Sequence, residues 1–181
     1  MSTTQNTRDL LLSQGQRLFW GRGYSNVGLR EIAAAAGVDV ALVSRYFGSK
    51  QGLFSATLEA LDALGPSDFP DEDALTETIV HLFVTAPRDG DEPSAFNMML
   101  VNARDPDVGE MVRKAHQEKW QNALEAVIGD STRATLFMAA VLGFALAEKH
   151  LRLSGLGAPD GAEYAAQLRH VLRAALDYEP A

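Results

Sequence analysis

Apolar residues recur along this chain at the spacing of an α-helix, and runs that alternate with period two are almost absent. The clearest apolar face lies near the start, where a helix over residues 7–20 places Leu11, Leu12, Gly15, Leu18 and Phe19 together. Similar patterns predict helices over residues 28–36, 40–47, 49–64, 71–86, 93–103, 106–128, 132–153 and 160–177. The sequence therefore predicts an all-α fold of about nine helices.

Turn and capping residues separate these helices. Gly21-Arg22-Gly23 is expected to end the first helix, and Gly37 to follow the second as its C′ residue. Asp39 and Ser49 are expected to cap the third and fourth helices. The stretch Gly65–Pro70 is the clearest candidate boundary. We expect an N-terminal domain at residues 1–48, a linking helix at 49–64 and a C-terminal domain at 65–181.

Composition excludes several classes of protein. The chain has no cysteine, so disulfides, cysteine-ligated zinc and iron–sulfur clusters are impossible. The N-terminus does not resemble a secretory signal, and the longest low-charge stretch, residues 134–147, is shorter than the roughly 20 residues that span a bilayer. We expect a cytoplasmic protein without membrane contact. The net charge of −8 combines a balance of +3 over residues 1–54 with −11 over the remainder, which suggests that the basic part binds an anion.

Residues 28–47 have the proportions of a helix-turn-helix. Ala33 provides the small side chain that two closely crossing helices need, and Gly37 provides the turn. The apolar contacts beneath are expected from Ile32, Val38, Val43 and Phe47. The rest of the short second helix mixes small apolar groups with Arg45 and Tyr46, which suits the major groove of DNA. These residues alone also allow an ordinary surface helix.

The wider segment resembles a known family. Arg8 with Leu11-Leu12, LFWGRGY (18–24), LREIAAAAGV (29–38) and LVSRYFGSKQGLF (42–54) are similar to the DNA-binding domain of the TetR family of transcriptional repressors. The resemblance covers residues 8–58 without gaps. It implies a three-helix head that binds double-stranded DNA, a linking helix, a ligand-binding and dimerising body, and a homodimer. Three residues depart from the family pattern: Ser44 replaces an aromatic residue, Gly28 replaces Thr or Ser, and Gly15 replaces Ala.

Nine residues are predicted to contact DNA. Arg45 is the expected base reader, because a guanidinium can bond guanine O6 and N7 together. Lys50 opposes the helix dipole in the first turn of its helix, which is explained if a phosphate binds there. The resemblance suggests that the Tyr46 hydroxyl meets a phosphate, although Tyr46 also fits plain packing. Glu31 is expected to reach back to the Gly28 N–H. The complete set is Arg45, Ser44, Leu42, Ala41, Tyr46, Lys50, Arg30, Gly28 and Thr7.

Apolar stripes in the C-terminal domain have two interpretations each. The resemblance implies that the last two helices pair with their copies in a dimer, through Leu136, Ala140, Gly143, Phe144, Ala147, Leu168, Val171, Leu172 and Ala175. The same stripes could only close the core of one chain. A ligand pocket is expected among the middle helices, lined by Phe83, Phe96, Met99, Leu100, Trp120, Leu124 and Phe137, although each of these also fits plain core.

The sequence thus predicts a repressor that a mainly apolar small molecule releases from a palindromic operator. One alternative is a helical protein-interaction module that has lost specific DNA binding. Another is a small helical enzyme, but the sequence offers no convincing nucleophile–base pair, so we expect no catalysis. His81, His116, His150 and His170 are too dispersed for a metal site, and Asp105-Pro106-Asp107 is expected to be a helix-start turn. We expect no cofactor.

Overall fold

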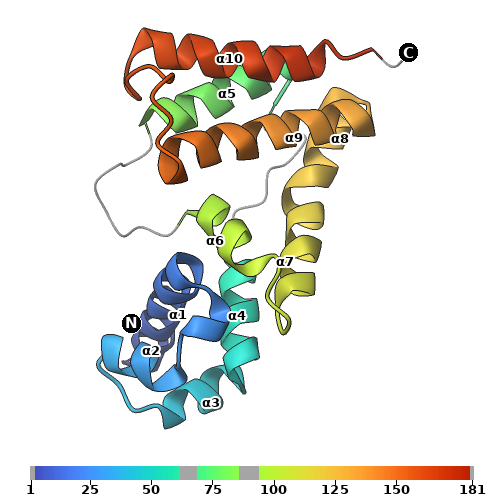
Figure 1. Cartoon of the computed structure of the whole chain (residues 1–181). Coiled ribbons are helices and arrows are strands. Elements are labelled where there is room, and N and C mark those ends of the chain that lie inside the picture. Colours follow the sequence, from blue (N-terminus) through green and yellow to red (C-terminus); the bar gives the residue numbers. More distant parts are fainter. Residues whose placement is uncertain (1–2, 62–68, 86–93, 180–181) are drawn as a thin grey trace. The chain divides into compact units, whose positions relative to one another are not determined.

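The computed structural model describes residues 3–61, 69–85 and 94–179. Every regular element in these ranges is a helix, which confirms the predicted all-α fold (Figure 1). The chain divides into two compact units. Of the described residues, 3–61 and 94–117 form the first unit, and 69–85 and 118–179 form the second. None of the described helices is long and apolar enough to cross a membrane.

The first unit contains six α-helices. They are α1 (Thr3–Arg22), α2 (Leu29–Ala35), α3 (Ala41–Phe47), α4 (Lys50–Glu59), α6 (Ala95–Asn102) and α7 (Gly109–His116), with a short 3₁₀ turn at Tyr24–Asn26. α1 packs against α2, α4 and α6, and α7 packs against α4 (Figure 1). Phe19, Tyr24 and Phe54 form an aromatic cluster with ring centroids 5.4–5.5 Å apart. This cluster anchors the three N-terminal helices on α4.

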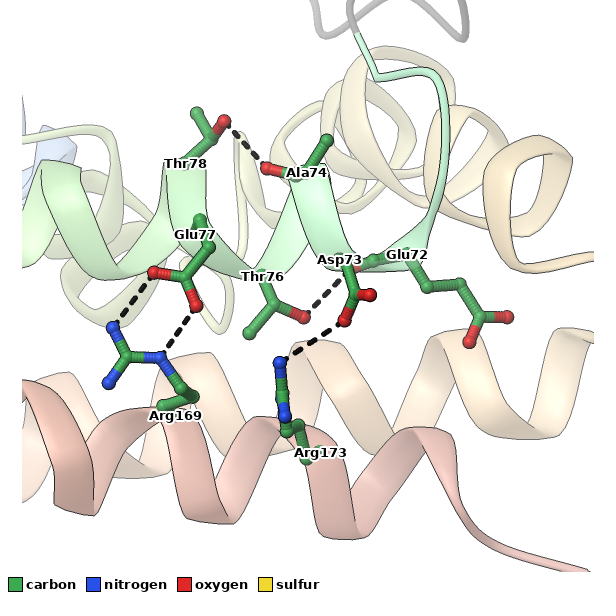
Figure 2. A network of polar contacts seen from close by, with 8 residues as sticks. All are labelled: Glu72, Asp73, Ala74, Thr76, Glu77, Thr78, Arg169 and Arg173. Carbon is green, nitrogen blue, oxygen red and sulfur yellow. Dashed lines mark hydrogen bonds and ion pairs between the residues drawn. The ribbon is translucent and has the colours of Figure 1, made fainter.

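The second unit is built from α5 (Glu72–Thr85), α8 (Asn122–Ile128), α9 (Ser131–Ala145) and α10 (Ala162–Leu176). α10 packs against both α5 and α9, and its Leu168 and Leu172 are fully buried. Figure 2 shows how ion pairs join α5 to α10: the Arg169 guanidinium donates to both Glu77 oxygens at 2.6 and 2.8 Å, and Arg173 donates to Asp73 at 3.2 Å.

Helix ends differ from the sequence predictions at several places. α1 continues through Gly21 to Arg22 and stops at Gly23, whose φ is +89°. α4 ends at Glu59 with Ala60 as its C-cap, earlier than the predicted end at residue 64. The expected boundary at Gly65–Pro70 falls largely outside the described residues.

Two predicted long helices contain π-helical stretches. The helix expected over 106–128 begins at Gly109 and has π geometry at Gln117–Gln121, between α7 and α8. α9 is likewise followed by a π-helical stretch at Leu146–His150. The predicted nine helices therefore appear in the described residues as ten α-helical segments, because one of them is split by its π turn.

Candidate nucleic-acid interface

The turn between α2 and α3 has the predicted geometry. Gly37 adopts a φ of +68°, and the Val38 N–H donates to the Ala33 carbonyl at 3.0 Å. The Asp39 carboxylate accepts the Ala41 N–H at 2.7 Å, so it caps the start of α3 as expected. Ala33 is buried where the two helices cross. A small residue, a glycine and a cap thus hold α3 at a fixed angle to α2.

α3 buries one face and presents the other. Val43 is completely buried, whereas Ala41, Ser44 and Arg45 are exposed. Leu42 and Tyr46 lie partly buried at the sides of the helix. The exposed face therefore carries the residues that the sequence predicts as base readers, with the Arg45 guanidinium as their most versatile hydrogen-bond donor.

The start of α4 is fixed directly after α3. Gly48 has a φ of +76°, and the Ser49 hydroxyl accepts the Gly52 N–H at 3.0 Å, as a helix cap does. Gly52 packs against the Phe47 carbonyl so closely that a Cβ on Gly52 would overlap its oxygen. The end of α3 and the first turn of α4 are therefore in direct backbone contact.

Lys50 has a structural partner at the first turn of α4. Its Nζ lies 4.1 Å from the centroid of the Tyr24 ring, in a cation–π contact. The pKa of Tyr24 is raised, first by burial of the hydroxyl and then by the negative charges of Asp107 and Asp105. The cation–π contact explains how a lysine is tolerated against the helix dipole, and it holds the ammonium group near the positive end of α4.

The remaining predicted DNA contacts lie on α1 and α2. Arg30 is exposed in the first turn of α2, and Thr7 is partly buried on α1. Gly28 is the N-cap of α2 and receives no side-chain hydrogen bond. The expectation that Glu31 reaches back to Gly28 is wrong: the Glu31 carboxylate pairs with the Arg22 guanidinium. This ion pair offers the carboxylate a charged partner, which a backbone N–H does not.

One cation beside α3 was not predicted as a DNA contact. The Arg8 guanidinium lies 5.2 Å from the centroid of the Phe47 ring, and Phe47 packs edge-on against Tyr46. Arg8 therefore stands next to the C-terminal end of α3. The sequence gives no spacing that would pair a residue of α1 with one of α3, so only a fold could bring them together.

Helix α6 is joined to the three N-terminal helices by buried amide groups. The Oδ1 of Asn102, a fully buried residue, accepts the Tyr24 N–H at 2.6 Å, and its Nδ2 donates to the Phe19 carbonyl at 3.1 Å. The Asn97 Nδ2 donates to the Trp20 carbonyl at 2.7 Å. Residues 94–117, which the sequence assigns to the C-terminal domain, therefore pack with the N-terminal helices.

The predicted ligand-lining residues are divided between the two units. Phe96, Met99 and Leu100 belong to the first unit, where Leu100 is 43% exposed. The others belong to the second unit: Phe137 and Leu124 are buried in its core, and two are partly buried, Phe83 and Trp120. The packing within each unit thus brings together only subsets of the predicted lining.

The predicted dimer residues also separate by burial. Leu136, Gly143 and Val171 are exposed on α9 and α10, and Ala140 is partly buried, as is Ala147 in the π-helical stretch after α9. The rest are buried within the core of their own chain, namely Phe144, Leu168, Leu172 and Ala175. An interface on this surface would be formed by the exposed group, with the buried group supporting it from behind.

Comparison with protein families supports the resemblance found in the sequence. Residues 11–57 match the model described as bacterial regulatory proteins, tetR family. Residues 73–176 match the model described as tetracyclin repressor-like, C-terminal domain. The chain belongs to the tetR family. Proteins of this family are non-enzymatic regulators that bind DNA and act as dimers with small-molecule effectors.

Solved structures of tetR-family proteins share the fold. NalD of Pseudomonas aeruginosa, the secondary repressor of the MexAB-OprM multidrug efflux pump, is 19% identical and matches with a TM-score of 0.68 over 95% of each chain. SCO4454, a TetR-family regulator of Streptomyces coelicolor, is 17% identical and also matches with a TM-score of 0.68 over 95% of each chain. A regulator from Rhodococcus sp. is 18% identical, with a TM-score of 0.63 over 96% of this chain and 100% of its own. No protein with a curated description matches the chain.

Proposed function

We propose that this protein is a homodimeric transcriptional repressor that reads a palindromic operator with α3 of each protomer. The observation that carries the proposal is the helix-turn-helix itself: α3 is fixed by its buried Val43 and presents Ser44 and Arg45 to solvent. Membership of a family of DNA-binding regulators supports the same function. The proposal includes action in the cytoplasm, because the chromosomal DNA of bacteria lies there.

The roles of the DNA-contacting residues follow from their positions. Arg45 reads bases, with Ser44, Leu42 and Ala41 beside it on α3. Lys50 and Tyr46 bind phosphates at the two sides of this helix, and Arg30, Gly28 and Thr7 contact the backbone. Phosphate contacts fix the orientation of the head, while base contacts give sequence preference. The charge balance of +3 over residues 1–54 favours both kinds of contact.

Dimerisation is proposed to use the exposed face of α9 together with α10. The exposed side chains of α9 are all uncharged: Ser131, Thr132, Thr135, Leu136, Ala139 and Gly143. A surface without charge favours burial against a second copy, since no charged group has to be desolvated. A two-fold dimer gives each head one half of a palindromic site.

Release from DNA is proposed to follow the binding of a small, mainly apolar effector among the predicted lining residues. The partly buried Phe83 lies at the edge of the second unit's aromatic core, 6.1 Å from Phe144 between ring centroids. The negative charge of residues 55–181 disfavours a strongly anionic effector. An effector that weakens operator binding must itself bind less tightly to the operator complex, by the same factor.

Selection of binding sites from a pool of random duplex DNA tests the proposal. We expect the selected sequences to contain two inverted half-sites whose centres are about one helical turn, or a small multiple of it, apart. Footprinting should protect both half-sites, with one protein dimer per duplex. A monomer that protects one short asymmetric site would contradict the proposal, and weak salt dependence without sequence preference would favour a protein-interaction module instead.

A further inference from the structure

A chain of contacts connects the first turn of α4 with the turn that precedes α7. Lys50 lies over the ring of Tyr24, with its Nζ 4.1 Å from the centroid. The next residue, Ser25, donates its N–H and its hydroxyl to the Asp105 carboxylate, at 3.3 and 2.6 Å. We call residues Asp105–Asp107 the acidic turn. This turn is therefore tied to the residue that follows the partner of Lys50.

A second contact closes the chain from the other side. Gln51, directly after Lys50, donates its amide to the Asp107 carbonyl at 3.2 Å. The same amide contacts the Met111 sulfur at 3.6 Å. The acidic turn is thus held against the first turn of α4 at two points, through Ser25 and through Gln51. All of these residues belong to the first unit.

The two carboxylates of the acidic turn differ in what they contact. The Asp105 carboxylate accepts four hydrogen bonds, two from Ser25 and two from the N–H groups of Asp107 and Val108, so it holds the turn together. Asp107 makes its described contacts with its backbone N–H and carbonyl, and the residue is exposed. The charge of Asp107 can therefore be removed while the turn keeps its hydrogen bonds.

The electrostatics agree with this geometry. The charges of Asp107 and Asp105 both raise the pKa of Tyr24, so the two carboxylates lie within electrostatic reach of the ring that holds Lys50. Charges a few ångströms apart at a protein surface interact appreciably at low salt, and salt screens them over about 10 Å at 0.1 M. A DNA phosphate beside Lys50 would meet the ammonium group and an acidic turn on the same surface.

We propose that the acidic turn is an electrostatic brake on DNA binding, in which the Asp107 carboxylate opposes the binding of phosphates beside Lys50. This inference rests on the proposed function, because it requires DNA at the first turn of α4. The brake acts on the phosphate backbone, so it weakens binding to operator and non-operator DNA by the same factor. It lowers the affinity that an effector of modest coupling energy has to overcome.

The test compares three neutralised variants with the wild-type dimer. Asp107→Asn and Asp107→Ser remove the charge of the acidic turn. Asp160→Asn makes the same change in net charge at an exposed residue of the second unit. Dissociation constants are measured by fluorescence anisotropy for a selected operator and for a random duplex of equal length, at about 50 mM and about 500 mM salt. Thermal unfolding of each variant confirms that it is folded.

At low salt we expect both Asp107 variants to bind both duplexes about two- to tenfold more tightly than wild type. The gain should nearly vanish at high salt, and Asp160→Asn should match wild type. Unchanged or weaker binding, a gain on the operator alone, or an equal gain in Asp160→Asn would each overturn the brake. If wild type does not prefer its selected operator, the proposed function fails instead, so the two failures are distinguishable.

Discussion

The contact between Gly52 and the Phe47 carbonyl predicts that a single added methyl group will disturb the recognition helix. In Gly52→Ala the new Cβ would lie closer than 3.0 Å to the carbonyl oxygen and 3.2 Å from the carbonyl carbon. The obstacle is backbone, so α3 and α4 must move apart. Such overpacking costs about 1–3 kcal/mol or more, which exceeds the roughly 1 kcal/mol gained in helix propensity.

Two other glycines of the same unit give a graded control series. In Gly15→Ala the Cβ would lie 3.2–3.3 Å from the flexible side chain of Leu53, so the change in unfolding free energy should be small. In Gly21→Ala the Cβ meets nothing within 4 Å, and α1 should be stabilised by about 0.4–1 kcal/mol. The order of stability should therefore be Gly21→Ala, wild type and Gly15→Ala close together, then Gly52→Ala.

Urea unfolding followed by fluorescence of Trp20 measures this series. Trp20 is 3% exposed in the first unit, and a Trp120→Phe background removes the other tryptophan. Gly52→Ala should lower the unfolding free energy by about 1–3 kcal/mol and weaken operator binding, because Phe47 ends α3. A Gly52→Ala protein as stable as wild type, with unchanged DNA affinity, would refute the described junction between α3 and α4.

Three further predictions concern α6, α5 and the dimer surface. Asn102→Leu should cost about 1–3 kcal/mol in urea unfolding, because it leaves buried backbone groups without their amide partner; an unchanged midpoint would contradict this. The hydrogen bond from Arg169 lowers the pKa of Glu77, so the pair should stabilise the fold above the unfolded-state pKa of Glu77 and lose this effect as pH falls. Because the pair is exposed, the difference from Glu77→Gln in thermal unfolding between pH 3 and 7 should be a few tenths of a kcal/mol, and no pH dependence would contradict the assignment. Leu136→Glu should convert the dimer to monomer in sedimentation, whereas Leu82→Glu, at an exposed site of α5, should not; the reverse result would move the interface elsewhere.

The helix-turn-helix could be predicted because its signals are local. Gly37, Asp39 and Ser49 act on backbone groups within four residues of themselves, and the structure confirms all three. Local signals of this kind depend on φ preferences and on caps, which a sequence states directly. The fold class followed in the same way from the spacing of apolar residues.

The placement of α6 could not be predicted because its contacts are remote in sequence. Asn102 bonds Tyr24, 78 positions away, and Asn97 bonds Trp20, 77 positions away. An asparagine in a helix reads as a surface residue until a partner buries it, so periodicity hides this junction. The ion pair of Glu31 with Arg22 was missed although the two residues are near in sequence, because a local cap looked sufficient.

The apolar stripes of α9 and α10 show a different limit. Periodicity identifies an apolar face but not what covers it. Leu168 and Leu172 lie in the core of their own chain, whereas Val171 is 39% exposed. Only the fold separates these residues, so the dimer surface remains a prediction whose exposed members can now be named.

The ratio of operator affinity to random-DNA affinity tests the central claim that α3 reads bases through Arg45. At one salt concentration, Arg45→Ala should weaken operator binding by about 1–3 kcal/mol and leave binding to random DNA nearly unchanged. Lys50→Ala should weaken both by similar factors and reduce the salt slope by about one. The account predicts a ratio that collapses for Arg45→Ala and is kept by Lys50→Ala. A ratio unchanged in Arg45→Ala would contradict it.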